Sequence, residues 1–151
     1  MEESLTLLLA DIPLFSDLDY EETNTIEKLL DLRSIKGGTL IYAQGEHADS
    51  MCCVISGELE VVKKLKEGGE KVLTILTKGD SVGEMALIDG LTRSADIRAR
   101  NAGRILILKR DAFNKLIQQH PQISIKILKQ IARRLSMNLR KTSEAASRAG
   151  K

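Results

Sequence analysis

Residues 51–62 of the chain read Met51-Cys52-Cys53-Val54-Ile55-Ser56-Gly57-Glu58-Leu59-Glu60-Val61-Val62. Two short runs of mainly apolar residues, several of them β-branched, lie here on either side of the dipeptide Ser56-Gly57. Such runs are typical of β-strands, and a glycine-containing dipeptide between them is typical of a hairpin turn. The stretch therefore predicts a pair of antiparallel strands.

The same alternation of apolar runs and glycines continues on both sides of this hairpin, over about residues 32–109. The other runs cover residues 39–42, 72–76, 95–99 and 104–108, and Gly68-Gly69 marks a second hairpin turn. Short strands at a spacing of roughly ten residues, separated by glycine turns, predict a β-barrel or a β-sandwich.

The pattern becomes helical on both sides of the strands. Residues 1–31 are expected to form short helices, and Asp19 is expected to cap one of them together with Glu22, three residues later. Residues 111–119 predict another short helix. Residues 122–141 predict a long one, because apolar residues recur at every fourth position: Ile123, Ile127, Ile131, Leu135 and Leu139.

The length of 151 residues allows one domain. We expect a single domain over residues 1–141, with a helical lead (1–31), a barrel (32–109) and C-terminal helices (110–141), followed by a flexible tail (142–151). No apolar run reaches the roughly 18 residues that a membrane span needs. The acidic start of the chain does not resemble a secretory signal.

Cysteine usage points to a reducing compartment. The only two cysteines are adjacent, and they lie inside an apolar run, so we interpret Cys52 and Cys53 as small buried hydrophobic residues rather than a redox pair. Together with the unremarkable N-terminus, this predicts a cytoplasmic protein.

The net charge of +2 hides a strong asymmetry between the two halves of the chain. Residues 1–75 carry 7 basic and 15 acidic residues, whereas residues 76–151 carry 16 basic and 6 acidic residues. The second half is therefore expected to face something anionic, such as a phosphorylated ligand, a partner or the acidic first half. Only 3% of the residues are aromatic, which argues against a stacking platform for single-stranded nucleic acid.

One stretch interrupts the strand pattern with Gly83-Glu84-Met85-Ala86-Leu87 and, further on, Thr92-Arg93-Ser94-Ala95. Residues 84–88 favour one helical turn, and a helix start after a glycine offers free N–H groups to an anion. The guanidinium of Arg93 is suited to phosphate, Ser94 adds a hydroxyl group and Ala95 leaves space. The pattern predicts an anion site, with an ordinary loop carrying a surface Glu–Arg pair as the alternative.

Glu84 restricts the kind of anion, because a carboxylate beside a phosphate repels it. The arrangement makes sense if the ligand also presents a hydroxyl group for the carboxylate to accept, as a ribose does. A phosphate next to a free ribose hydroxyl describes a nucleotide. The residues alone leave this reading and the ordinary loop open.

This stretch resembles the phosphate-binding cassette of the cyclic nucleotide-binding domain family, which includes bacterial catabolite activators and regulatory subunits of the cAMP-dependent kinase. The resemblance runs from about residue 12 to 140, and it is carried outside the cassette by Ile12-Pro13-Leu14-Phe15, Gly45-Glu46, Ile55-Ser56-Gly57-Glu58-Leu59 and Ile131-Ala132-Arg133-Arg134-Leu135. Two positions depart from the family pattern: Val82, where Phe is frequent, and Asp96, where an apolar residue or Thr is frequent. An inward-facing Asp96 would repel a phosphate.

The resemblance implies a fold that is mainly β with flanking helices: a jelly-roll β-barrel (a double-stranded β-helix) with short N-terminal helices and a long C-terminal helix. It also implies the ligand-binding residues. Arg93, Ser94 and the backbone of residues 83–86 would hold the cyclic phosphate, and Glu84 would accept the ribose 2′-hydroxyl. The full set of expected ligand-binding residues is Val61, Leu73, Gly83, Glu84, Met85, Ala86, Arg93, Ser94, Ala95, Arg134 and Asn138.

The base would lie against Val61 and Leu73, with the long helix as a lid. Arg134 and Asn138 are four residues apart and share a helix face, and Asn138 could contact adenine through its amide. A solvated helix face is the alternative for these two residues. The basic residues of this helix, too, are expected to form a solvated face.

No motif predicts catalysis or a metal site. His47 and His120 are the only histidines and lie far apart in the sequence. The serines lack companions that would make a nucleophile, and no Walker-type or dinucleotide-binding glycine pattern occurs. We expect no enzyme activity and no cofactor.

The sequence thus predicts a sensor domain that binds a cyclic nucleotide, cAMP rather than cGMP, and relays closure through its C-terminal helix to an effector protein in trans. A weak homodimer through that helix is a further expectation, and nucleic acid is not expected as a partner. The alternative is a degenerate barrel that binds no nucleotide and serves as a protein-interaction module.

Overall fold

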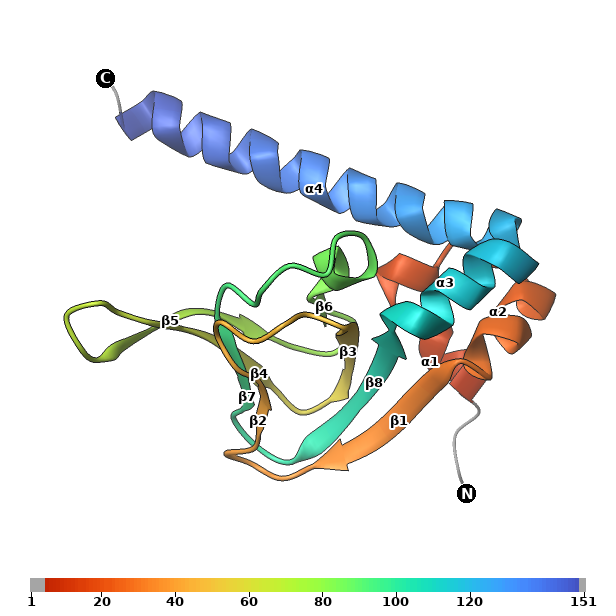
Figure 1. Cartoon of the computed structure of the whole chain (residues 1–151), viewed down its shortest axis with the longest axis horizontal. Coiled ribbons are helices and arrows are strands. Elements are labelled where there is room, and N and C mark those ends of the chain that lie inside the picture. The colour runs from red at the N-terminus through yellow and green to blue at the C-terminus, as the bar shows by residue number, and fades with distance from the viewer. Residues whose placement is uncertain (1–4, 150–151) are drawn as a thin grey trace.

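The computed structural model describes residues 5–149, and glycine turns divide its central part into two four-stranded antiparallel sheets (Figure 1). One sheet has the order β1-β8-β3-β6, formed by Leu30–Ile35, Gly103–Lys109, Ser50–Ser56 and Ser81–Val82. The other has the order β2-β7-β4-β5, formed by Leu40–Tyr42, Asp96–Ala99, Leu59–Lys64 and Glu70–Leu76. The predicted barrel-like β fold with helices at both ends is confirmed.

The two strands predicted in residues 51–62 form on either side of Ser56-Gly57, but they belong to different sheets and do not pair with each other, so the predicted hairpin is wrong. β3 pairs with β8 and β6, whereas β4 pairs with β5 and β7. All residues of β3 before Ser56 are buried, which explains the unbroken apolar run. Met51, Cys53 and Ile55 face a core cluster shared with the helices, and Cys52 and Val54 face a second cluster between the sheets.

Six helical segments surround the sheets within residues 5–149: α1 (Leu5–Ala10), η1 (Pro13–Phe15), α2 (Tyr20–Glu27), η2 (Glu84–Leu87), α3 (Arg110–Gln119) and α4 (Pro121–Ala149). The predicted capping box of α2 is present. The Glu22 N–H donates to the Asp19 carboxylate at 2.8 Å, and the Asp19 N–H donates to the Glu22 carboxylate at 3.0 Å. None of these segments has a stretch long and apolar enough to cross a bilayer.

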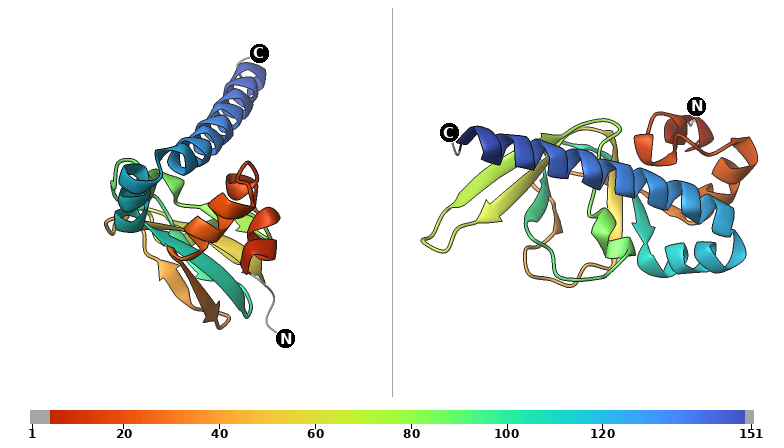
Figure 2. Two further views of the ribbon diagram at one scale, coloured as in Figure 1. Left: turned by 90° about the vertical axis from the view of Figure 1, so that its right-hand side faces the viewer. Right: turned by 90° about the horizontal axis from the view of Figure 1, so that it is seen from above.

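The long helix α4 crosses over the sheets from α3 toward the β4–β5 side of the molecule (Figure 2). It continues to Ala149 instead of ending at residue 141, as we had expected from the tail composition. Alanine and charged residues support a helix well, and Arg148 in its last turn complements the helix dipole.

The long apolar stripe of α4 divides into a buried and an exposed part. Ile123, Ile127 and Ile131 are fully buried in the core cluster shared by the helices and the first sheet. Leu135 and Leu139 are 38% and 68% exposed, since α4 has by then passed the elements that cover it. The predicted four-residue periodicity therefore describes packing only in the first half of the helix.

Some of the basic and polar side chains of α4 contact acidic residues of the helical lead. The Lys126 ammonium lies 2.5 Å from the Glu22 carboxylate, and the Gln130 amide donates to Asp17 at 2.5 Å. The hydrogen bond to Glu22 also raises the pKa of Lys126. The acidic first half is thus one of the surfaces that the basic second half faces.

Burial gives the two thiols a testable property. Desolvation raises the pKa of Cys52 to about 12, and it raises the pKa of the fully buried Cys53 as well. Both thiols therefore stay protonated at neutral pH, and a raised pKa means that their reactivity increases only in strongly alkaline solution. We expect a disulfide reagent such as dithionitrobenzoate to leave both thiols unmodified at pH 8 and to titrate both after unfolding in guanidinium. Rapid modification of the folded protein would contradict this packing.

Candidate functional site

The cassette lies between β6 and β7 and is shaped by Gly83. Gly83 has a φ of +81°, a left-handed conformation that residues with a side chain rarely adopt, and it begins the short helix η2 as expected. A Cβ atom at this position would lie 2.7 Å from the Arg93 guanidinium. The glycine thus permits both the turn and the close approach of the arginine.

Arg93 is buried at the wall of the site and is only 8% exposed. Its Nη2 donates to the Ser50 carbonyl oxygen at 2.6 Å, and its guanidinium carbon lies 3.6 Å above the centre of the Tyr42 ring. Its Nε is buried with no hydrogen-bond partner, the only such side-chain polar atom among residues 5–149. A buried cationic donor without a partner favours an anion beside it.

A cavity of about 370 Å³ opens beside Arg93, within the size range of small-molecule sites. Eight of the eleven expected ligand-binding residues line it: Val61, Gly83, Glu84, Met85, Ala86, Arg93, Ser94 and Ala95. Its remaining wall includes Tyr42, Val82 and Ile97, so one side is apolar and the other carries the cassette.

Glu84 connects the cassette to α4. The Ser81 hydroxyl donates to Glu84 Oε1 at 2.7 Å, and Nη1 of Arg134 lies 3.2 Å from the same oxygen. Arg134 also donates to the Ser81 hydroxyl and, at 3.2 Å, to the Ser81 carbonyl oxygen. The predicted lid residue therefore reaches the cassette through a three-residue network, although it does not line the cavity.

Comparison with known proteins places this site in a family. The sequence profile of the cyclic nucleotide-binding domain matches residues 32–120. The chain belongs to that family. The predicted resemblance is confirmed, and the cavity lies where the family cassette, residues 83–95, meets the second sheet.

Two relatives of the domain are regulatory proteins by name. The chain is 37% identical over 109 residues to a cAMP-activated global transcriptional regulator of Salmonella typhimurium, covering 72% of this chain and 51% of the relative. It is 34% identical over 114 residues to a cAMP-dependent protein kinase regulatory subunit of Mycosarcoma maydis, covering 72% of this chain and 22% of the relative. The chain thus spans about half or less of the length of these relatives.

A solved structure agrees with this placement. The catabolite activator protein of Thermus thermophilus superposes with a TM-score of 0.76 at 28% identity, over 89% of this chain and 63% of that one. The likeness includes the flanking helices, because the superposed part is longer than residues 32–120.

Two residues expected at the base of the ligand do not line the cavity. Leu73 is 51% exposed, because it lies in the part of β5 from Glu70 to Thr74 that is exposed throughout. A register shift against Val61 and Val62 also leaves Leu73 as the extra residue of a bulge. Asn138 is exposed on the part of α4 that has passed the cassette. Neither residue is in place to contact a ligand in this arrangement of the cassette and α4.

One detail of the cassette differs from expectation, and a second decides between the two possibilities for Asp96. The Ala86 N–H, expected to face an anion, donates to the Gly83 carbonyl oxygen at 3.0 Å. Asp96, which would repel a phosphate if it faced the site, is absent from the cavity lining. Its carboxylate accepts from the Gln44 N–H at 2.7 Å and lies 3.6 Å from Lys64, so it fixes the β2–β3 loop.

Sequence reasoning missed the residue that supports Arg93. Tyr42 appeared only as the end of a predicted strand, yet its ring lies under the guanidinium and its hydroxyl bonds to the Ser50 hydroxyl at 2.8 Å. The contact joins residues from β2 and the β6–β7 segment, which only the closed barrel brings together. Among residues 5–149 no cluster of three or more metal-ligating side chains occurs.

Proposed function

We propose that this chain is a regulatory sensor that binds a cyclic mononucleotide, cAMP in preference to cGMP, in the cavity beside Arg93. The observation that carries the proposal is the buried guanidinium with an unpartnered Nε at the wall of a preformed cavity. The names of the relatives, which describe activation by or dependence on cAMP, support the choice of ligand. The proposal needs neither catalysis nor a cofactor, and the free thiols of Cys52 and Cys53 agree with a cytoplasmic location.

The roles of the site residues follow from their chemistry. The cyclic phosphate would accept hydrogen bonds from Arg93, from Ser94 and from the backbone at the start of η2. Glu84 would accept the ribose 2′-hydroxyl. Because Ser81 and Arg134 both use Oε1 of Glu84, its Oε2 remains for the ligand. The base would rest on the apolar wall that contains Val61, and Leu73 and Asn138 would reach it only after a rearrangement of the β4–β5 hairpin and α4.

Thermal unfolding in the presence of nucleotides tests the proposal. A ligand that binds only the folded state stabilises it by RT ln(1 + [L]/Kd), about 2.7 kcal/mol at a hundredfold excess over Kd. We expect cAMP to raise the melting temperature by several degrees, roughly 5 °C for a domain of this size, cGMP to raise it less, and 5′-AMP to leave it unchanged. Equal melting curves with and without millimolar cAMP would contradict the proposal.

Relay to a partner would pass through the network of Glu84, Ser81 and Arg134. These contacts connect the cassette, which the ligand would touch, with α4, which does not line the cavity. A ligand that fixes Glu84 would favour the arrangement in which α4 is held against the cassette, and this is a population shift between open and closed states. The readout would be a separate effector protein that senses the position of α4.

Arg134→Ala tests this relay. The side chain of Arg134 is 34% exposed, so we expect a small loss of affinity for cAMP, about fivefold or less. We expect the variant to lose the slowing of amide hydrogen exchange that cAMP causes over residues 131–149 in the wild type. Arg133→Ala is the matched control, because this neighbouring side chain is exposed and forms no ion pair with the described residues. Ligand-dependent protection of α4 that persists in Arg134→Ala would contradict the relay.

A further inference from the structure

The second half of α4 has an apolar face that nothing in residues 5–149 covers. Leu135 and Leu139 are 38% and 68% exposed there, and Ile125, on the same side near the start of the helix, is 52% exposed, although the opposite face of the first half is fully buried. Figures 1 and 2 show the helix projecting from the rest of the molecule, with no other element beside its second half. Large apolar side chains in this number on one helix face indicate an interaction surface.

The exposed residues follow a heptad pattern that differs from the buried stripe. Their spacing alternates between three and four residues, which keeps them on one side of the helix and is the pattern by which helices pair with each other. We call this surface the α4 seam; it consists of Ile125, Leu128, Ala132, Leu135, Leu139, Thr142 and Ala146, of which Leu128 is half-buried against the core cluster and the others are exposed. A shallow groove runs along its second half, with Arg140 and Glu144 at its edge.

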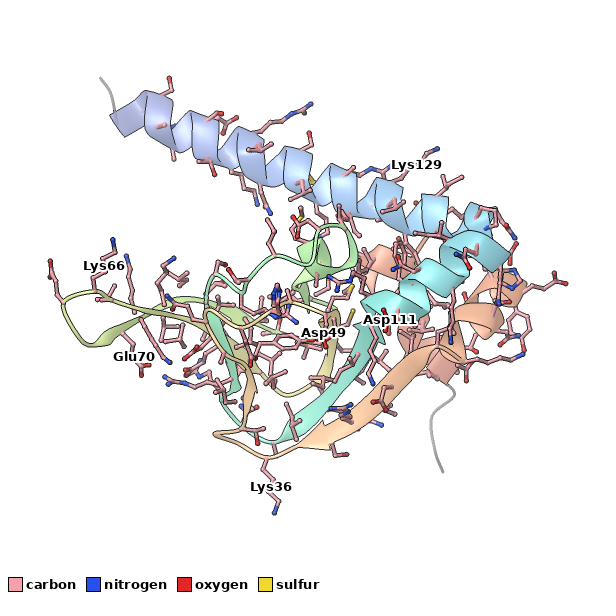
Figure 3. The ribbon with its side chains drawn as sticks, in the orientation of Figure 1. Lys36, Asp49, Lys66, Glu70, Asp111 and Lys129 are labelled. Carbon is pink, nitrogen blue, oxygen red and sulfur yellow. The ribbon has the colours of Figure 1, made fainter. Side chains whose placement is uncertain are left out.

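The charges around the seam are mostly positive. α4 carries seven Lys or Arg residues and a single acidic residue, Glu144. Lys126 and Arg134 pair with Glu22 and Glu84, whereas the other five have no ion-pair partner among the described residues: Lys129, Arg133, Arg140, Lys141 and Arg148. Figure 3 shows the Lys129 side chain pointing away from the barrel. The helix therefore offers an apolar strip beside uncompensated positive charge.

We propose that the α4 seam binds an acidic amphipathic helix of a partner protein. Because this partner would be the effector that senses α4, the proposal rests on the proposed function. Apolar residues of the partner would pack on the seam, and its carboxylates would face Lys129, Arg133 and Arg140. Such complementarity fixes the choice of partner and speeds association.

Self-pairing fits the same surface less well. Two copies would bring together two strongly basic helices with one carboxylate each, and like charges oppose such a contact. The heptad positions also include Ala132, Thr142 and Ala146, which bury little apolar surface. The weak homodimer predicted from the sequence is therefore the competing outcome.

The proposal is tested with a fluorescein-labelled peptide on the full chain without nucleotide. The peptide has roughly three heptads, with Leu at the positions that face the seam and Glu at the flanking positions. We expect it to bind, a matched peptide with Lys in place of Glu to bind at least about tenfold more weakly, and about 0.5 M NaCl to weaken binding about tenfold. Because no nucleotide is present, the result does not depend on whether the cavity binds cAMP.

Two substitutions locate the contact. Leu139→Asp places a carboxylate on the seam, and we expect it to weaken peptide binding at least about tenfold. Met137→Asp is the matched control, because Met137 is 54% exposed on the opposite side of the same helix and the change in charge is identical. Circular dichroism of both variants confirms folding.

Three results would overturn the proposal. The first is that the acidic peptide does not bind at about 100 µM, a concentration well above the Kd of most specific contacts. The second is equal binding of the acidic and basic peptides. The third is a homodimer of the chain alone that Leu139→Asp dissociates, because this would make a second copy the occupant of the seam.

Discussion

Arg93→Ala is expected to weaken cAMP binding about a hundredfold or more. Hydrogen bonds to charged groups contribute about 1.5–3 kcal/mol each, and a guanidinium can donate two of them to one phosphate, so their joint loss corresponds to at least two powers of ten in Kd. Arg93→Lys keeps the charge but loses the forked donor geometry, and we expect an intermediate affinity. Titration calorimetry on the three proteins measures the series.

Folding must be separated from binding in this series, because Arg93 also contacts Tyr42 and Ser50. Arg98→Ala is the matched control: Arg98 is bound to Glu60 and Glu70 on the outer side of the second sheet and does not line the cavity. We expect it to bind cAMP as the wild type does. An Arg93→Ala variant that melts cooperatively and still binds within about threefold of the wild type would refute the assignment of the phosphate site.

Glu84→Ala is expected to weaken cAMP binding about tenfold to a hundredfold, because the ribose hydroxyl loses its charged acceptor. The ligand offers a second way to remove the same bond. In the wild type, 2′-deoxy-cAMP is expected to bind more weakly than cAMP by a similar factor. In Glu84→Ala, the two ligands are expected to bind equally, because the bond is already absent.

Asp89→Ala provides the matched control for the carboxylate. Asp89 also lines the cavity, but its carboxylate accepts from the Leu91 N–H at 3.0 Å within the loop. We expect this variant to keep the full discrimination between cAMP and its 2′-deoxy analogue. Discrimination that survives unchanged in Glu84→Ala would assign the ribose contact to another residue.

The parts of the fold that depend on local sequence could be predicted. The apolar run of β3, the turn at Ser56-Gly57, the capping box of α2 and the short helix after Gly83 all form where the residues indicate them. Each depends on neighbours within a few positions, such as Asp19 with Glu22. The cassette residues could be placed at the cavity for the same reason, since they are nearly contiguous.

Features created by distant pairing could not be predicted. Leu30 falls in the predicted helical lead of residues 1–31, yet its pairing with Leu108 makes it the first residue of β1. Leu73 lies outside the cavity because its part of β5 is exposed throughout, and Tyr42 reaches Arg93 only through closure of the barrel. Tertiary contacts override local preference in all three cases.

The periodicity of α4 shows how one pattern can contain two surfaces. The four-residue repeat joined Ile123, Ile127 and Ile131, which are buried, to Leu135 and Leu139, which are exposed. A repeat of four drifts around the helix because a turn has 3.6 residues, so its two ends face different directions. Only the position of the sheets and the helical lead decides where burial ends.

Calorimetric titration of the folded chain with cAMP tests the central claim most directly. The site predicts saturable binding with one cAMP for each chain, weaker binding of cGMP, and no binding of 5′-AMP, which lacks the cyclic phosphate. Absence of heat with cAMP and with cGMP at two temperatures, on protein that melts cooperatively, would contradict the claim that this domain binds a cyclic nucleotide.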